Sequence, residues 1–468
     1  MPAVIASVVP NVYWMIAVWV AGGGVALIGA LCFAELTTSY PDRGGDYGYL
    51  KRAYSRHIGF AFSWTAFWVI RPTSIALMAI IFGEFAIAVF PETLSVLWFS
   101  ITAIVGLSLT NLLGVRCGKS AQNVLTVAKV VGILIVVLAA FAFWPDSTSA
   151  KAGDGASGVA NVEVANVEVA NVEVANVEVA NVEVANVEVA KTLDQVEPAE
   201  QEETEESAWE WFWLSMVYVM FTFGGWNDIA FVATETREPK KNLFRALVIG
   251  TGVVLLVYLL FNFALMYGLG FDRLKELGGN WENATSVLVE QNMGELGGWL
   301  VSILVCVSCL GAINAMIFTS PRIYWATASD YPGLAWMTGA DAGRGWGRSM
   351  LLQALVTIIY VATFGGDKHG VENLTNANAP FFWFFLALTV ASLMISRVRF
   401  PGKFDGYRVP LYPVLPIVFI GACLFMVYRS WSWMMQQELA IPAMAIGGWV
   451  VVGVVLSFVL RTNDQSTR

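Results

Sequence analysis

Histidine and charged residues are scarce in this sequence. Of its 468 residues only 13% are charged, 57% are hydrophobic, and just two are histidines, His57 and His369. A soluble domain needs roughly twice that charged fraction to cover its surface. No His, Asp and Glu residues cluster within an apolar segment, so candidate metal ligands and catalytic bases are lacking. We therefore expect a membrane protein that is not an enzyme and holds no metal and no cofactor.

Cysteine is also sparse, and no basic stripe is present. The five cysteines show no framework spacing, and the one C-x-x-C pair, Cys306 and Cys309, lies inside an apolar segment, where packing is the expected role. The net charge of −9 comes mostly from one acidic loop. Without a basic patch, no nucleic acid is expected as a partner.

Long apolar segments, by contrast, fill most of the chain. The mean hydropathy is +0.63, and blocks of about 20 apolar residues are each long enough to cross roughly 30 Å of hydrocarbon. Eleven transmembrane helices are predicted, over residues 12–38, 58–90, 95–113, 121–144, 211–231, 244–270, 296–326, 350–365, 381–396, 412–428 and 441–460.

A partial helix is predicted before them. Residues 1–9 form a short apolar piece that ends at Pro10. Nine helical residues reach about 13 Å, which is less than half of the bilayer. We interpret this piece as the outer half of helix 1, and an upstream start codon is the simplest source of the inner half.

Loop charges predict the orientation. Placing residues 41–57 in the cytoplasm puts nineteen Lys and Arg residues on that side and six on the outer side, while Arg71 and Lys129 fall inside predicted spans. Cytoplasmic loops of membrane proteins carry the excess of Lys and Arg. The sequence therefore predicts a lipid-embedded, multi-pass protein of the cytoplasmic membrane, with a cytoplasmic amino terminus in the full-length protein.

A low-complexity insert occupies residues 145–208. It holds six copies of Asn-Val-Glu-Val-Ala over residues 161–190, followed by an acidic run. A repeat of five residues builds no single apolar face, either as a strand or as a helix. We interpret the insert as an exposed, weakly structured outer loop that grew by copying errors, and a ligand-binding repeat is the alternative.

Two helices are predicted to be broken. One is the partial helix 1, and the other contains the pair Gly224 and Gly225, followed by Asn227. Irregular backbone within a membrane is tolerated where it lines a cavity, and corresponding broken helices in two repeats form the central site of many transporters. The glycine pair alone is also compatible with close helix packing.

Several motifs resemble one known family. The matching stretches include Ala34-Glu-Leu36, Pro41-Asp-Arg-Gly-Gly45, Tyr47-Gly-Tyr-Leu50, Ile70-Arg-Pro-Thr-Ser74, Asn111-Leu-Leu-Gly-Val115, Phe221-Thr-Phe-Gly-Gly-Trp-Asn227, Glu238-Pro-Lys-Lys-Asn-Leu243 and Gly311-Ala-Ile-Asn314. In this order they resemble the amino acid–polyamine–organocation superfamily and, within it, the L-type amino acid transporters and their bacterial permease relatives. The resemblance covers nearly the whole chain apart from the insert.

The resemblance implies an all-α membrane protein with a five-plus-five inverted-repeat fold. Partial helix 1 and helices 2–5 would occupy residues 1–144, and helices 6–10 would occupy residues 209–397. Helices 11 and 12 and a short cytoplasmic tail would fill residues 398–468. The outer loop 91–95 has no cysteine, so a disulfide-linked heavy subunit, as in animal relatives, is not expected.

The resemblance also implies a substrate site. Phe221 is similar to the aromatic residue that closes over bound substrate, and Asn227 would shape the side-chain pocket. The backbone of Phe221, Thr222, Gly224 and the adjacent Gly225 would face the substrate ammonium. Ile70 and Trp383 would line the pocket.

Five charged residues are candidates for coupling or gating. Lys129 is similar to a lysine of the family that lies where sodium-coupled relatives bind a sodium ion. The alternative is a lysine whose side chain extends to the membrane surface. Arg71 is expected mainly to cap carbonyls freed by the following proline, and less to contact substrate. Asp228 departs from the family pattern, in which an uncharged residue is usual, so charged substrates are a second possibility beside neutral ones. Glu35 and Glu235 would pair with cytoplasmic cations.

The predicted function is secondary active transport of amino acids, independent of sodium, by alternating access. Exchange and proton coupling both remain open. The glycine-rich carboxylate cradle that the family has on helix 1 would lie before Met1. The alternative is therefore an amino acid sensor or a degenerate permease that does not transport.

Overall fold

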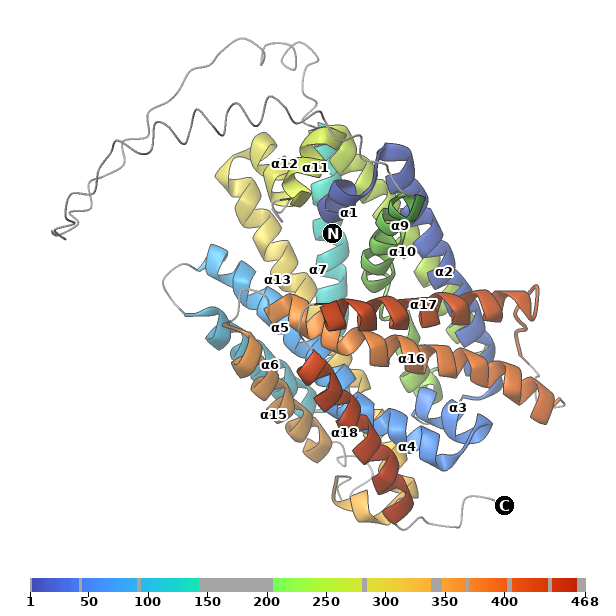
Figure 1. The fold of residues 1–468 in the computed structure, drawn as a ribbon. Helices are drawn as coiled ribbons and strands as arrows, with labels where there is room; N and C mark the ends of the chain where they lie inside the picture. The colour runs from blue at the N-terminus through green and yellow to red at the C-terminus, as the bar shows by residue number, and fades with distance from the viewer. Residues whose placement is uncertain are drawn as a thin grey trace, which may run out of the picture. The chain divides into compact units, whose positions relative to one another are not determined.

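The computed structural model describes residues 2–41, 44–90, 94–142, 205–279, 284–337, 347–366, 370–401, 406–436 and 440–460. Every regular element among these residues is a helix (Figure 1). The chain divides into two compact units, residues 1–144 with 214–468, and residues 145–213. The predicted low-complexity loop over 145–208 falls in the second unit, and its six repeats lie outside the described residues.

The described helices follow one another along the chain, with a gap between residues 142 and 205. In chain order they are α1 (Pro2–Val8), α2 (Val12–Ser39), α3 (Asp46–Ala53), α4 (Arg56–Thr65), η1 (Ala66–Ile70), α5 (Arg71–Val89), α6 (Val96–Leu112), α7 (Val115–Ala142), α9 (Glu205–Thr222), η3 (Trp226–Glu235), α10 (Pro239–Leu269), α11 (Phe271–Gly279), α12 (Ala284–Met293), α13 (Glu295–Thr319), α14 (Pro321–Asp330), η4 (Pro332–Met337), α15 (Gly347–Phe364), α16 (Gly370–Arg399), α17 (Val414–Gln436) and α18 (Ala440–Val459).

Each of the eleven predicted spans overlaps helix in the structure. Eight helical stretches in the described part of the chain are long and apolar enough to cross a membrane, and α6 and part of α18 are shorter apolar helices. The prediction of several membrane-spanning helices is therefore confirmed. The count of eleven and the five-plus-five repeat stay predictions.

The outward face of α10 shows why this fold needs lipid. Ile249, Val253, Leu256, Leu260 and Phe263 are exposed, and their spacing of three and four residues places them on one face of the helix. Apolar surface left in water costs about 25 cal/mol per Å². Contact with acyl chains removes this cost, so the exposed stripe fits a membrane environment.

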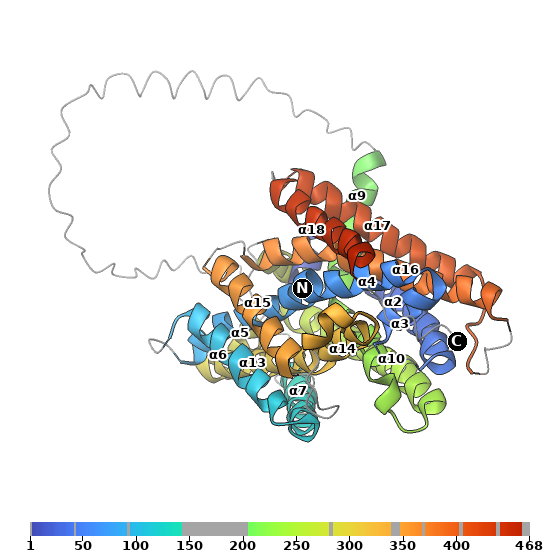
Figure 2. The same ribbon diagram turned by 90° about the horizontal axis from the view of Figure 1, so that it is seen from below.

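Small residues let α2 pack closely on its neighbours. A Cβ atom at Gly22 would lie 2.3 Å from Val219 of α9, and one at Gly23 would lie 2.3 Å from Leu255 of α10. Such glycines allow helix backbones to approach within a membrane, where dispersion contacts replace the hydrophobic effect. Elsewhere α13 packs along α5, and α16 runs beside α17 (Figure 2).

Regular α-helix is interrupted at three places, two of which lie next to the residues of the site. Helix α1 ends at Val8 and α2 begins at Val12, next to Pro10. The span from α4 to α5 contains the π-helical turn η1 just before Arg71. Helix α9 ends at Thr222 and a 3₁₀ helix, η3, resumes at Trp226. The structure therefore confirms the predicted break in the helix that contains Gly224 and Gly225.

Candidate functional site

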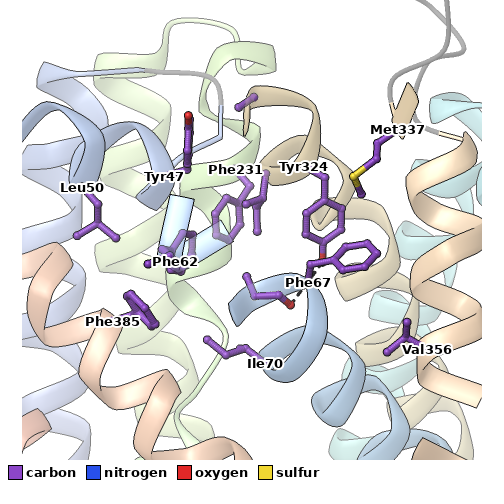
Figure 3. Packing of buried hydrophobic residues seen from close by; sticks show 14 residues of the cluster. Tyr47, Leu50, Phe62, Phe67, Ile70, Phe231, Tyr324, Met337, Val356 and Phe385 are labelled. Carbon is purple, nitrogen blue, oxygen red and sulfur yellow. Dashed lines mark hydrogen bonds between the residues drawn. The ribbon is translucent and has the colours of Figure 1, made fainter. Parts of the chain in front are cut away.

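A small cavity lies beside the break between α9 and η3. Its volume of about 20 Å³ is enough for one water molecule. Figure 3 shows Phe62, Ile70 and Phe385 converging on this part of the core from α4, η1 and α16. The cavity is lined by Asp46, Phe62, Ala66, Ile70, Arg71, Asn227, Phe382, Phe385 and Leu386.

The π-helical turn presents Ile70 and Arg71 to this cavity. A π-helical turn inserts one extra residue into the helix, and such turns often mark functional sites. Pro72 has no N–H, so the carbonyl of Trp68 loses its helical donor. The hydroxyl of Tyr360 donates to that carbonyl at 3.2 Å instead. The carbonyl of Trp68 therefore has a partner other than the side chain of Arg71.

Arg71 is paired with Asp228. Its two terminal nitrogens donate to the two carboxylate oxygens at 2.7 Å each, and the side chains are only 9% and 18% exposed. Thr319 donates to the same carboxylate at 3.3 Å, and the guanidinium lies 5.0 Å from the ring of Phe231. The expectation that Arg71 caps freed carbonyls is replaced by this pair, because a bidentate carboxylate is a stronger acceptor for a guanidinium.

Asp46 was missed by the sequence analysis. Gly44 and Gly45 precede it with φ values of +88° and +52°, and a Cβ at Gly45 would lie 2.9 Å from the backbone of Ala230 in η3. Only glycine permits this close turn. It places the Asp46 carboxyl against the cavity, 4% exposed, where its Oδ1 has no hydrogen-bond partner in the described part of the chain. The signal was a carboxylate directly after a Gly-Gly turn between two apolar spans.

Burial changes the acidity of this carboxyl. Loss of hydration raises the pKa of Asp46 to about 8, the guanidinium of Arg71 acts in the opposite direction, and the carboxylate of Asp228 adds to the increase. Charged groups in a low-dielectric site shift towards their neutral form when no partner compensates. The site therefore contains one carboxyl that is ready to take up a proton.

The predicted pocket residues are only partly brought together. Ile70 and the buried Asn227 line the cavity, whereas the buried Trp383 does not. On α16 the lining is made by Phe382 with Phe385 and Leu386. Residues three and four apart share a helix face, and Trp383 lies one step, about 100°, around the axis.

The glycine turn itself lies outside this cavity lining. The carbonyl of Phe221 accepts from the N–H of Gly224 at 3.1 Å, and that of Thr222 accepts from the hydroxyl of Tyr258 at 3.2 Å. A carbonyl has two lone pairs, so both can accept a further donor. Gly225 adopts φ +101° and is exposed.

Ion pairs gather at the end of the bundle that the loop charges predict to be cytoplasmic. Arg397 of α16 donates to Glu35 of α2 at 2.7 and 2.5 Å, and the N–H of Val409 donates to the same carboxylate at 2.7 Å. Nearby, Lys51 of α3 donates to Asp330 of α14 at 2.6 Å. Glu35 and Arg397 thus link α2 to α16.

Two further candidates stand apart from the cavity. Lys129 of α7 is half-buried and interacts electrostatically with Cys309 of α13, and its ammonium has no hydrogen bond or ion pair within the described ranges. Glu235 ends η3, and its side chain lies outside the described residues. In the part of the chain that the structure describes, no group of three His, Cys, Asp or Glu side chains could hold a metal ion.

Comparisons with known proteins identify the family. The family model described as amino acid permease matches residues 1–456. The b(0,+)-type amino acid transporter 1 of Mus musculus is 26% identical over 425 residues, which cover 88% of this chain and 74% of the relative. The serine/threonine exchanger SteT of Bacillus subtilis is 25% identical over 412 residues, covering 87% and 80%.

A third relative extends the comparison to another transporter type. The large neutral amino acids transporter small subunit 2 of Mus musculus is 23% identical over 430 residues, which cover 89% of this chain and 69% of the relative. The matches span the apolar helices, both sides of the break before η3 and the buried site. The chain belongs to the amino acid permease family, within the amino acid–polyamine–organocation superfamily.

Proposed function

We propose that this protein carries neutral amino acids across the cytoplasmic membrane by alternating access, independently of sodium. The observation that carries the proposal is the interrupted helix at residues 223–225, beside a buried cavity in an apolar bundle. An interrupted helix exposes N–H and C=O groups that match the carboxylate and ammonium of an amino acid. Phe221, Thr222, Gly224 and Gly225 are its proposed backbone contacts.

The charge balance of the site favours neutral substrates. Asp228, the departure from the family pattern, is matched by Arg71, so the pair adds no net charge. Ile70, Phe385 and Leu386 offer an apolar wall for a substrate side chain. Two of the three relatives have names that agree, the large neutral amino acids transporter small subunit 2 and the serine/threonine exchanger SteT.

Alternating access requires the site to open in turn to each side. The cavity of about 20 Å³ is far smaller than an amino acid, so substrate entry requires the surrounding helices to move apart. The links from Glu35 to Arg397 and from Lys51 to Asp330 are placed to hold one end closed. We assign this end to the cytoplasm, with the amino terminus of the full-length protein on the same side.

Sodium independence is proposed from Lys129. Lys129 is half-buried on α7 and interacts electrostatically with Cys309 of α13, and in the proposal its ammonium is the positive charge of this place. A fixed cation would repel a coupling cation from the same place. The absence of cysteine from loop 91–95 further favours a carrier without a disulfide-linked partner.

Counterflow in proteoliposomes tests this function. Full-length protein is reconstituted into liposomes that contain unlabelled leucine, and labelled leucine, serine or lysine is added outside, with either sodium or choline present. We expect leucine and serine to accumulate equally in both salts, and lysine to remain outside. Strict sodium dependence, or a preference for lysine, would contradict the proposal, and binding without uptake would identify an amino acid sensor.

A further inference from the structure

Asp46 is a buried carboxyl that the proposed transport function leaves unused. It is the first residue of α3, 4% of its surface is exposed, and Oδ1 lacks a hydrogen bond among the described residues. The carboxyl lines the same cavity as Arg71 and Asn227. That cavity has room for one water molecule, which could form a hydrogen bond with the carboxyl.

Among the described residues, the charges that act on Asp46 are those of Arg71 and Asp228. Both terminal nitrogens of Arg71 donate to the oxygens of Asp228, so its positive charge is already balanced. An ionised Asp46 would leave one excess negative charge in a buried site whose other lining residues are mostly apolar. An uncompensated buried charge is costly, and protonation removes that cost.

The charged groups named below lie on described parts of the other elements packed against α3, and each has a partner other than Asp46. Arg397 of α16 binds Glu35, Arg399 of α16 donates to the carbonyl of Ala53, and Asp330 of α14 accepts from Lys51 and Tyr47 of α3 itself. On α4, His57 forms a hydrogen bond with Ser457, and Arg56 also has interactions of its own. The amino-terminal dipole of α3 favours an anion at Asp46, but it contributes only about 0.3–1 kcal/mol.

We propose that Asp46 is the proton-binding site of this carrier, protonated while the cavity is closed and deprotonated when α2, α3 and α16 separate on the side of Glu35 and Arg397. This inference rests on the proposed transport function and selects proton coupling over exchange. One O–H bond forms on the carboxylate from a hydrated proton on one side, and the same bond breaks to water on the other. No electron transfer is involved.

The proposal fixes the charge that moves in each cycle. A neutral amino acid zwitterion has no net charge, so a loaded carrier with protonated Asp46 carries one proton charge inward. The pKa of Asp46, about 8 when the cavity is closed, would fall towards its ordinary value once water reaches the carboxyl. Uptake should therefore be driven by an inwardly directed proton gradient and should be electrogenic.

Two measurements on full-length protein in liposomes test the proposal. The first follows labelled leucine uptake, together with internal acidification reported by a trapped pH dye, from about pH 6 to about pH 9.5. The variants are Asp46→Asn, which mimics the protonated form, and Asp272→Asn, which removes an exposed carboxylate on α11 as a matched control. The second is an infrared titration of the protonated-carboxyl band in wild type and Asp46→Asn.

We expect wild type and Asp272→Asn to take up protons with leucine and to lose uptake above about pH 8. Asp46→Asn should exchange leucine without moving protons, and its rate should not depend on pH. Leucine uptake by wild type without proton movement, or unchanged proton coupling in Asp46→Asn, would overturn the inference but leave amino acid transport standing. A lack of uptake by wild type at every pH would instead refute the proposed function.

The infrared titration decides the case in which Asp46→Asn does not fold. A protonated-carboxyl band in wild type that disappears with a midpoint near pH 8 supports the proposal. A site that is already ionised at about pH 6 overturns it. Asp272→Asn should leave this band unchanged.

Discussion

Arg71 and Asp228 join α5 to η3 through two hydrogen bonds of 2.7 Å, although 157 positions separate them in the sequence. We predict that Asp228→Asn lowers the stability of the purified protein by about 3–5 kcal/mol, because it leaves a buried guanidinium unpaired. The double variant Arg71→Gln/Asp228→Asn should recover part of this loss. Thermal unfolding followed by size-exclusion chromatography measures both effects.

An exposed pair provides the control. Arg273 donates to Glu276 at 2.6 Å, but the two side chains are 49% and 60% exposed. Breaking it by Glu276→Gln should cost less than about 1 kcal/mol. Equal melting temperatures for Asp228→Asn and Glu276→Gln would show that the buried pair has no special role.

The glycine turn before η3 is predicted to depend on one residue. Gly225 has φ +101° and open space around it, so an alanine there meets no neighbouring atom but adopts an unfavourable backbone conformation. We expect the backbone strain in Gly225→Ala to cost about 1–2 kcal/mol and to weaken leucine binding about tenfold. Gly250→Ala in α10, where the space is equally open and the backbone is helical, should be neutral or slightly stabilising. Equilibrium binding to the two variants separates backbone strain from lost space.

The sequence alone predicted the helices and the break well, because both depend on local properties. Apolar blocks of membrane length specify the spans. The break at Gly225 was predictable because a positive φ requires a residue without Cβ. The segments are therefore correct to within a few residues at most ends, although η1 and the 3₁₀ form of η3 were not anticipated.

The site was predicted less completely because it depends on contacts between distant segments. The partner of Arg71 lies on a helix that no local pattern connects to it, and proline chemistry favoured carbonyl acceptors instead. Asp46 was passed over because its burial arises from the packing of α3 against other elements. The family resemblance implies Trp383 as a pocket residue, but the rotation of α16 brings Phe382 and Phe385 to the cavity instead.

The contact between Glu35 and Arg397 predicts a closed gate. Glu35→Gln removes a carboxylate that accepts from Arg397 and from the N–H of Val409, and charged hydrogen bonds contribute about 1.5–3 kcal/mol each. Cys32 is buried one turn before Glu35, so its alkylation reports opening. In a variant whose other cysteines are alanine, Glu35→Gln should raise the labelling rate of Cys32 about tenfold or more.

A control must show that the labelling of Cys32 reports opening at Glu35 and Arg397, and not a general loss of stability of the protein. Glu276→Gln, at the exposed pair on α11, is the matched substitution and should leave Cys32 protected. Unchanged protection of Cys32 in Glu35→Gln would contradict a gating role for this ion pair.

Lys129 distinguishes a coupling lysine from one that merely reaches the membrane surface. Its half-buried ammonium between α7 and α13 predicts that Lys129→Ala loses most uptake while the protein still folds. Lys129→Arg should rescue poorly, since a planar guanidinium does not replace a compact ammonium. Lys119→Ala, on the exposed surface of the same helix, should transport normally. Full activity of Lys129→Ala would favour the snorkelling alternative.

The buried carboxyl of Asp46 also predicts how stability depends on pH. Its pKa is about 8 in the folded protein against an ordinary value of 3.8, so between these values the folded state holds a proton that the unfolded chain has released. Stability should therefore fall as the pH rises through this window. The melting temperature of wild type should decline from about pH 5 to about pH 9, and Asp46→Asn should decline less. The difference between the two proteins isolates Asp46 from other titrating groups. The same dependence of melting temperature on pH in wild type and Asp46→Asn would show that this carboxyl is already ionised in the folded protein.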